Sequence, residues 1–121
     1  MIRVKFLFVE GCPASGPTLK LLRQVIRDMG VPARVKIVRL VDPDSAREQR
    51  FLGSPSIRID GRDLEGGEPG EATLYGCGCR LYREQEPGMP TGTPSRKLIA
   101  RALLAAQLKK IRQRSMPLPI Q

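Results

Sequence analysis

Hydrophobic residues recur along the chain with two different periods. Residues 2–9 (IRVKFLFV) alternate loosely and end in a nearly continuous apolar run, which predicts a strand covered on both faces. Between residues 18 and 29 the apolar positions follow helical spacing, and Gly30 is the left-handed residue that commonly ends a helix. Residues 35–41 form a second run rich in β-branched side chains, which predicts another strand.

The middle of the chain predicts a short helix followed by a hairpin. Pro43 is typical of a helix start, so we expect a helix over roughly residues 44–52. Residues 56–60 alternate apolar and charged side chains, which predicts a third strand with isoleucines on one face. Asp60-Gly61 is the strongest hairpin pattern in the chain and leads to a short fourth strand at residues 62–64.

The C-terminal part predicts a long loop and a long helix. Residues 65–93 are rich in Gly, Pro and Glu and show no clear period, so we expect a long loop. Thr93 as the N-cap and Pro94 at the first position predict a helix that runs to about Arg114, followed by a tail at 115–121. The apolar residues expected on one side of this helix are Leu98, Ile99, Ala102, Leu103, Ala106 and Ile111.

These elements predict an α/β fold with the order β-α-β-α-β-β-α. Strands that alternate with helices usually pair in parallel through right-handed crossovers, so the first three strands are expected to be parallel. The last two strands are expected to be antiparallel. The result is a four-stranded mixed sheet with helices on both faces. A chain of 121 residues fits one domain, here expected over residues 1–114.

Positive charge dominates the composition. The chain has 21 Lys and Arg against 12 Asp and Glu, a net charge of +9, and no histidine. A basic balance favours anionic partners, but no aromatic side chains accompany the basic residues of the last helix to stack bases. We therefore expect a solvated basic face. The alternative is a docking surface for an acidic partner or nucleic acid, although nucleic acid is not the expected partner. The basic set is Arg96, Lys97, Arg101, Lys109, Lys110, Arg112 and Arg114.

The expected location is the cytoplasm, without a membrane partner. The N-terminal apolar run is too short for a targeting signal and is broken by Lys5, and no stretch is long enough to span a membrane. Cytoplasmic thiols stay reduced, so Cys12, Cys77 and Cys79 are expected to be reactive, metal-binding or inert rather than paired in a disulfide framework. The absence of histidine excludes a hydrolase that uses a histidine base.

Cys12 lies between the first strand and the first helix, in the stretch Gly-Cys-Pro-Ala-Ser at residues 11–15. A thiol at a helix N-terminus faces backbone N–H groups and the positive end of the helix dipole. Both favour the thiolate, which is the nucleophilic form. The alternative is a buried cysteine at a chain reversal, inert because it is desolvated.

The chain resembles the thioredoxin-like superfamily at two places. Residues 11–15 resemble the active-site motif with a cysteine at both ends, but Ser15 stands at the second cysteine position. Pro55, in the stretch Gly-Ser-Pro-Ser, stands where this superfamily has a cis-proline that faces the active-site cysteine. FVEGCP, RFLGSPSIRIDGRD and YGCGCRLY together resemble small bacterial thioredoxin family proteins, some of them labelled alkylmercury lyase-like.

The resemblance covers about residues 1–105 and implies thiol–disulfide oxidoreductase activity on a protein or a low-molecular-weight thiol or disulfide. It implies a site of Cys12 as nucleophile, Ser15, and Pro55 as a backbone clamp. With a serine in the motif, a mixed disulfide must be resolved by another thiol. Glutathione as co-substrate, or Cys77 or Cys79, could resolve it; otherwise Cys12 only binds. No other cofactor is expected, and the oligomeric state stays open.

Two alternatives come from other classes. Cys77-Gly78-Cys79 can chelate a soft metal, and with Cys12 it would supply three sulfur ligands to mercury or copper(I), including in organomercurial handling. A closed zinc site is not expected because it usually takes four Cys or His ligands. Cys77 and Cys79 could also simply pack within the loop. The remaining alternative is a non-catalytic adaptor that uses the fold and its basic helix.

Overall fold

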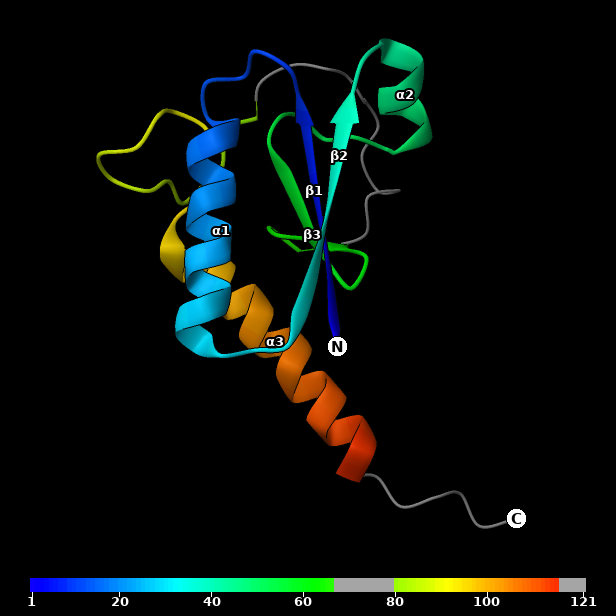
Figure 1. Cartoon of the computed structure of the whole chain (residues 1–121), viewed down its shortest axis with the longest axis vertical. Coiled ribbons are helices and arrows are strands. Elements are labelled where there is room, and N and C mark those ends of the chain that lie inside the picture. The colour runs from blue at the N-terminus through cyan, green and yellow to red at the C-terminus, as the bar shows by residue number, and fades with distance from the viewer. Residues whose placement is uncertain (67–79, 116–121) are drawn as a thin grey trace.

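The computed structural model describes residues 1–66 and 80–115 (Figure 1). Within them the fold is α/β and the elements follow the predicted order β-α-β-α-β-β-α. The elements are β1 (Ile2–Val9), α1 (Ser15–Met29), β2 (Ala33–Leu40), α2 (Pro43–Glu48), β3 (Ser56–Ile59), β4 (Arg62–Asp63) and α3 (Arg96–Ser115).

The four strands form one mixed sheet in the order β2-β1-β3-β4. β1 is parallel to β2 and antiparallel to β3, and β3 is antiparallel to β4. The prediction that the first three strands are parallel is therefore wrong for β3. The six residues of α2 rise only about 9 Å, whereas the eight residues of β1 extend over about 26 Å. The chain consequently stays at the end of the sheet where β2 stops, and β3 runs back from there.

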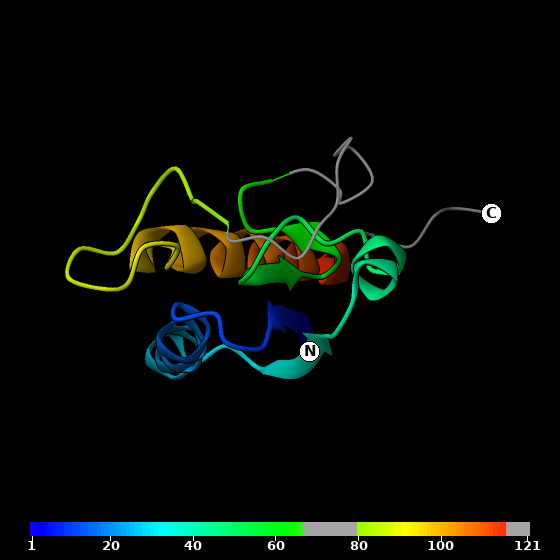
Figure 2. The same ribbon diagram turned by 90° about the horizontal axis from the view of Figure 1, so that it is seen from above.

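Helices cover both faces of the sheet, as predicted (Figure 2). α1 and α3 pack side by side on one face, where Phe6 of β1 lies among Leu22 of α1 and Ile99 of α3. On the other face α2 contributes Ala46 to a smaller cluster near the carboxyl ends of β1 and β2. That cluster consists of Leu7, Leu40, Ala46 and Phe51, with Val9 and Val38 packed against it.

α1 begins three residues before the predicted start and ends where predicted. Gly30 lies in the left-handed region with φ of 65°, and its N–H donates to the Ile26 carbonyl at 3.0 Å, which confirms the helix cap. Pro17 is the third residue of the helix. N–H groups in the first turn have no intrahelical acceptor, so a proline there removes no hydrogen bond.

α2 is shorter than predicted and ends at Glu48 rather than near residue 52. It begins at Pro43, after Asp42 accepts a hydrogen bond from the Ser45 N–H at 2.7 Å. The chain then reverses through Arg50, whose φ is +53°, and the Phe51 N–H donates to the Ala46 carbonyl at 2.8 Å. This turn buries the Phe51 ring completely, and the burial stabilises the fold more than a further turn of helix would.

The third strand and its hairpin agree with the sequence pattern. Ile57 and Ile59 are buried in the main core, and Asp60 and Gly61 both have positive φ, of 50° and 84°. These are the conformations of a two-residue turn that matches the twist of a hairpin. Asp60-Gly61 therefore connects β3 to β4 as predicted.

α3 begins at Arg96, so the predicted N-cap at Thr93 is wrong. Ser95 caps the helix, because its hydroxyl accepts from the Leu98 N–H at 3.1 Å. Thr93 is fully buried, and its hydroxyl bonds to that of Thr18 at 3.3 Å instead. The C-terminal half of α3 projects past the sheet (Figure 1), so Ile111, which was expected on the apolar side of the helix, is 50% exposed.

Part of the predicted 65–93 loop and part of the tail fall outside the described residues, namely 67–79 and 116–121. Residues 80–95 contain no helix, and an isolated bridge pairs Gln85 with Pro94. In the described ranges no helix combines the length and the apolar character that crossing a membrane requires.

Leu103→Ala and Leu104→Ala form a matched pair on α3. Leu103 is 0% exposed in the main core and Leu104 is 47% exposed. We expect Leu103→Ala to lower the free energy of unfolding by about 2–5 kcal/mol because it leaves a cavity, and Leu104→Ala to change it by no more than about 1 kcal/mol. Urea unfolding followed by circular dichroism measures both. Equal losses would contradict this packing of α3.

Candidate functional site

The loop between β1 and α1 presents Cys12 at the carboxyl end of β1. Gly11, with φ of +86°, turns the chain, and the Cys12 N–H donates to the Val9 carbonyl at 3.3 Å. The Ser15 N–H, the first of α1, donates to the Cys12 carbonyl at 3.2 Å. Cys12 is therefore held by backbone bonds on both sides, and its thiol is free and half-buried.

Ser54 is the residue to which the thiol points. The Cys12 thiol donates to the Ser54 carbonyl, with 3.7 Å between sulfur and oxygen. The Ser54 hydroxyl accepts from the Val9 N–H at 3.1 Å and lies 3.4 Å from the Ser15 hydroxyl. Sequence analysis did not single out Ser54, although it directly precedes the proline that the resemblance identified. Ser54, which lies just before β3, is therefore hydrogen-bonded to the end of β1.

These contacts change the acidity of the thiol. Burial alone would raise the pKa of Cys12. Hydrogen bonds from the Ser15 and Ser54 hydroxyls, and from the backbone N–H groups of Ala14 and Ser15, outweigh it and lower the pKa below that of an ordinary cysteine. Hydrogen bonds of this kind stabilise the charged form. The site can therefore hold a thiolate, which is the form that attacks a disulfide.

Pro55 lies next to this contact. The Ser54–Pro55 peptide bond is cis, as the resemblance implied. Pro55 is buried, and its carbonyl accepts from the Tyr82 hydroxyl at 2.6 Å. Burial raises the pKa of Tyr82, which keeps this phenol protonated as a donor. The structure thus brings Cys12, Ser15 and the Ser54–Pro55 bond together at one end of the sheet.

Arg80 holds the Ser54–Pro55 segment from the other side, and sequence analysis missed it. Its backbone N–H donates to the Ser54 carbonyl at 3.0 Å, the same oxygen that accepts from Cys12. Its guanidinium binds both carboxylate oxygens of Asp63, at 2.6 and 2.5 Å, and reaches Glu65 at 3.2 Å. A contact of the Ser54 carbonyl with an outside chain would therefore compete with Arg80.

The Arg80 guanidinium is buried yet fully charged. Burial would lower the pKa of Arg80, but the hydrogen bonds and charge of Asp63, with Glu65, raise it above its usual value. The guanidinium carbon also lies 4.2 Å from the centre of the Tyr82 ring. A cation over an aromatic face adds a further attraction. Arg80, Asp63 and Tyr82 thus form one packed unit beneath the candidate site.

Two of the cysteines considered from the sequence, Cys77 and Cys79, lie outside the described residues. Within residues 1–66 and 80–115 no group of three or more His, Cys, Asp or Glu side chains is placed to hold a metal ion. The soft-metal site of Cys12, Cys77 and Cys79 therefore stays a prediction.

Gly53→Ala and Gly16→Ala test how tightly Arg80 packs here. A Cβ at Gly53, where φ is +119°, would lie 2.9 Å from the Arg80 Cβ, whereas a Cβ at Gly16 meets nothing within 4 Å. We expect Gly53→Ala to destabilise the fold by about 1–3 kcal/mol. Gly16→Ala, inside α1, should be neutral or stabilise it by up to about 1 kcal/mol. Thermal unfolding measures both; a neutral Gly53→Ala would refute the close packing.

Comparisons with known proteins assign no family to the chain. It matches no protein-family model, no curated protein and no solved structure.

Proposed function

We propose that this protein carries out thiol–disulfide exchange with Cys12 as the nucleophile. The observation that carries the proposal is the group of hydrogen-bond donors around the Cys12 sulfur, namely the hydroxyls of Ser15 and Ser54 and the backbone N–H groups of Ala14 and Ser15, which lower its pKa. Ser15 is part of this set through its hydroxyl and its backbone N–H. A serine in this position cannot form a disulfide, so its role here is to stabilise the thiolate.

The arrangement of the sheet supports a thioredoxin-like fold as part of the proposal. The element order β-α-β-α-β-β-α and the four-stranded mixed sheet are compatible with the thioredoxin-like fold that the resemblance implies. The nucleophile between β1 and α1 and the cis-proline before β3 agree with that fold. A cytoplasmic location belongs to the same proposal, because free thiols persist in a reducing compartment.

The first step is attack by the Cys12 thiolate on one sulfur of a partner disulfide. A bond forms between the two sulfurs, the partner's S–S bond breaks, and the second partner thiol leaves as a thiolate. A second thiol must then attack the mixed disulfide and release the first partner half. When this thiol is a cysteine of the same chain, it attacks the Cys12 sulfur, the protein becomes oxidised by two electrons, and the partner disulfide is reduced to two thiols. When it is external glutathione, Cys12 returns to the thiolate and the glutathione is oxidised instead.

The best candidate for this second thiol is Cys79. Arg80, which follows Cys79 in the chain, donates its N–H to the carbonyl that accepts from the Cys12 thiol. This neighbour relation favours Cys79 over Cys77, and glutathione is the external alternative. Because Arg80 already occupies the Ser54 carbonyl, a small disulfide such as oxidised glutathione suits the site better than an extended protein segment, which would have to displace Arg80.

Ser15→Ala tests the source of the activation. In a Cys77→Ser/Cys79→Ser background only Cys12 reacts, and its alkylation rate is measured against pH. Loss of the Ser15 hydroxyl removes a group that lowers the Cys12 pKa, so the midpoint of the pH profile should move upward. The alkylation rate at neutral pH should fall by a smaller factor than the fraction of Cys12 present as thiolate. The reason is that a more basic thiolate is intrinsically more nucleophilic.

Ser95→Ala, at the cap of α3, serves as the control and should leave the midpoint unchanged. An unchanged midpoint in Ser15→Ala would show that its hydroxyl does not stabilise the thiolate.

Cys79→Ser and Cys77→Ser test the second step with matched variants two residues apart. Each reduced variant is treated with oxidised glutathione, and the glutathione adduct on Cys12 is followed by intact mass. We expect the adduct to persist in Cys79→Ser and to decay in Cys77→Ser and in the unmodified chain. Persistence in Cys77→Ser alone would assign the role to Cys77 instead. Persistence in all three proteins would leave external glutathione as the resolving thiol.

A further inference from the structure

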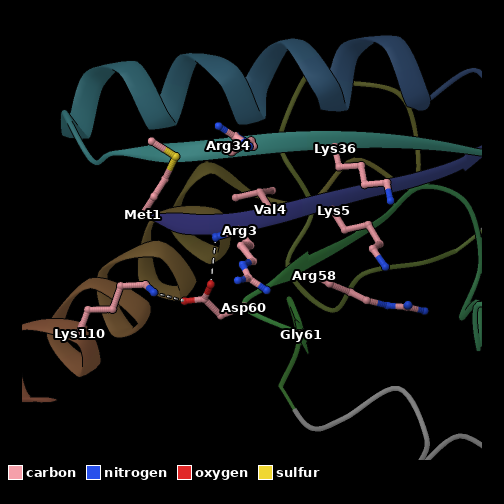
Figure 3. Close-up of a pocket in the computed structure, with 10 residues that line it drawn as sticks. All are labelled: Met1, Arg3, Val4, Lys5, Arg34, Lys36, Arg58, Asp60, Gly61 and Lys110. Atoms are coloured by element: carbon pink, nitrogen blue, oxygen red, sulfur yellow. Dashed lines mark hydrogen bonds and ion pairs between the residues drawn. The ribbon is translucent and has the colours of Figure 1, made fainter.

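Of the helices that the structure describes, none covers the amino-terminal half of one sheet face. α2 covers the face opposite α1 and α3 only at the carboxyl ends of β1 and β2, through the cluster around Phe51. At the amino-terminal half of β1 the same face forms an open groove of about 1030 Å³ (Figure 3). The basic side chains that line it come from three strands and from α3: Arg3, Lys5, Arg34, Lys36, Arg58 and Lys110.

The register of the strands arranges these charges in two rows. Lys5 on β1 lies opposite Lys36 on β2 and opposite Arg58 on β3. Arg3 lies opposite Arg34 in the next row of the same face. Neighbouring strands are only about 4.8 Å apart, and like charges directly opposite one another destabilise a sheet. A bound anion would relieve this repulsion.

Three of the charged residues in the groove, Arg58, Asp60 and Lys110, already have protein partners. The Arg58 guanidinium donates to the carbonyls of Gln49 and Arg50, at 2.5 and 2.8 Å. The Asp60 carboxylate accepts from the Arg3 backbone N–H at 2.9 Å and lies 3.7 Å from the Lys110 ammonium. Asp60 therefore compensates Lys110 rather than the lysines of the sheet.

The four remaining basic side chains have no such compensation from the part of the chain that the structure describes. The ion pairs formed there join other residues, and none of them includes Arg3, Lys5, Arg34 or Lys36. Arg3, Arg34 and Lys36 are exposed to solvent. The groove therefore presents a concentrated positive charge to whatever ligand enters it.

The residues that line the groove indicate which class of anionic partner fits it. Its apolar members are Met1, a single side chain that is 61% exposed, and Val4, which is only 2% exposed. A protein partner therefore finds no cluster of apolar anchors of the kind that dominates protein interfaces. None of the described lining residues is aromatic, so a single strand finds no surface on which its bases stack. A duplex requires neither, because its phosphates are already ordered and need only cations.

We propose that this groove binds the phosphate backbone of a duplex nucleic acid without regard to base sequence. The inference goes beyond the thiol chemistry and is independent of it, since Cys12 follows the opposite end of β1. Sequence analysis did not expect a nucleic acid because it considered only the basic residues of the last helix. The new surface arises from strand pairing that brings residues 3–5, 34–36 and 58 together.

The test uses the full chain, a short fluorescent DNA duplex and anisotropy at several salt concentrations. Arg3→Gln/Lys5→Gln/Lys36→Gln removes three charges from the groove, and Lys20→Gln/Arg23→Gln/Arg27→Gln removes three exposed charges from α1. We expect the groove variant to bind at least about tenfold more weakly, with the slope of log K against log salt reduced by roughly 0.9 per lost phosphate contact. The α1 variant should retain the affinity and the slope of the unmodified chain.

Equal weakening in the two triple variants would overturn the proposal, because net charge alone would then explain binding. Binding of a single strand but not of the duplex, or no binding by the unmodified chain, would overturn it as well. Thermal unfolding checks that both variants fold. If the groove triple variant does not fold, Arg34→Gln/Lys36→Gln on the edge strand β2 replaces it, with the slope expected to fall by about 1.8 for two contacts.

Discussion

The buried Arg80–Asp63 ion pair is the contact on which the candidate site depends. It joins the end of β4 to the segment that leads into α3, and both side chains are at least 93% buried. From this position the Arg80 backbone binds the Ser54 carbonyl, and Tyr82 binds the carbonyl of Pro55. Removing one partner of a buried pair leaves an uncompensated charge and costs about 3–5 kcal/mol. The geometry around Cys12 is thus supported by electrostatics on the far side of β3.

Ser54 connects the segment that Arg80 holds to the Cys12 thiol. Its carbonyl receives both the Arg80 N–H and the Cys12 thiol, and its hydroxyl holds the end of β1 through the Val9 N–H. Three parts of the chain distant in sequence therefore meet at one residue. The Ser54 hydroxyl helps to stabilise the thiolate, whereas the Ser54 carbonyl, which Arg80 occupies, is a backbone acceptor that an extended partner would need. The occupied carbonyl agrees with the proposed exchange with a small disulfide, and the groove proposed to bind an anionic ligand lies at the other end of β1.

Local patterns were sufficient for features that depend on neighbouring residues, such as the Gly30 cap and the Asp60-Gly61 hairpin. Local patterns gave wrong predictions for features that tertiary contacts determine. The direction of β3 depends on the short α2 and on the burial of Phe51. The N-cap of α3 is Ser95 rather than Thr93 because the Thr93 side chain is buried in the core. Cys12 was found from its place between a strand and a helix, and Ser15 and Pro55 were found through a resemblance. The partner of a buried guanidinium such as Arg80 is determined only by folding.

Cys12 is the residue whose reactivity decides whether the proposed chemistry takes place. The most direct measurement treats the reduced, folded Cys77→Ser/Cys79→Ser chain with oxidised glutathione and compares the rate of adduct formation at Cys12 with that of an unfolded cysteine peptide at neutral pH. A lowered pKa and a half-exposed thiol predict one glutathione on Cys12, formed faster than on the peptide. A Cys12 that reacts only after denaturant unfolds the chain would contradict the proposed function.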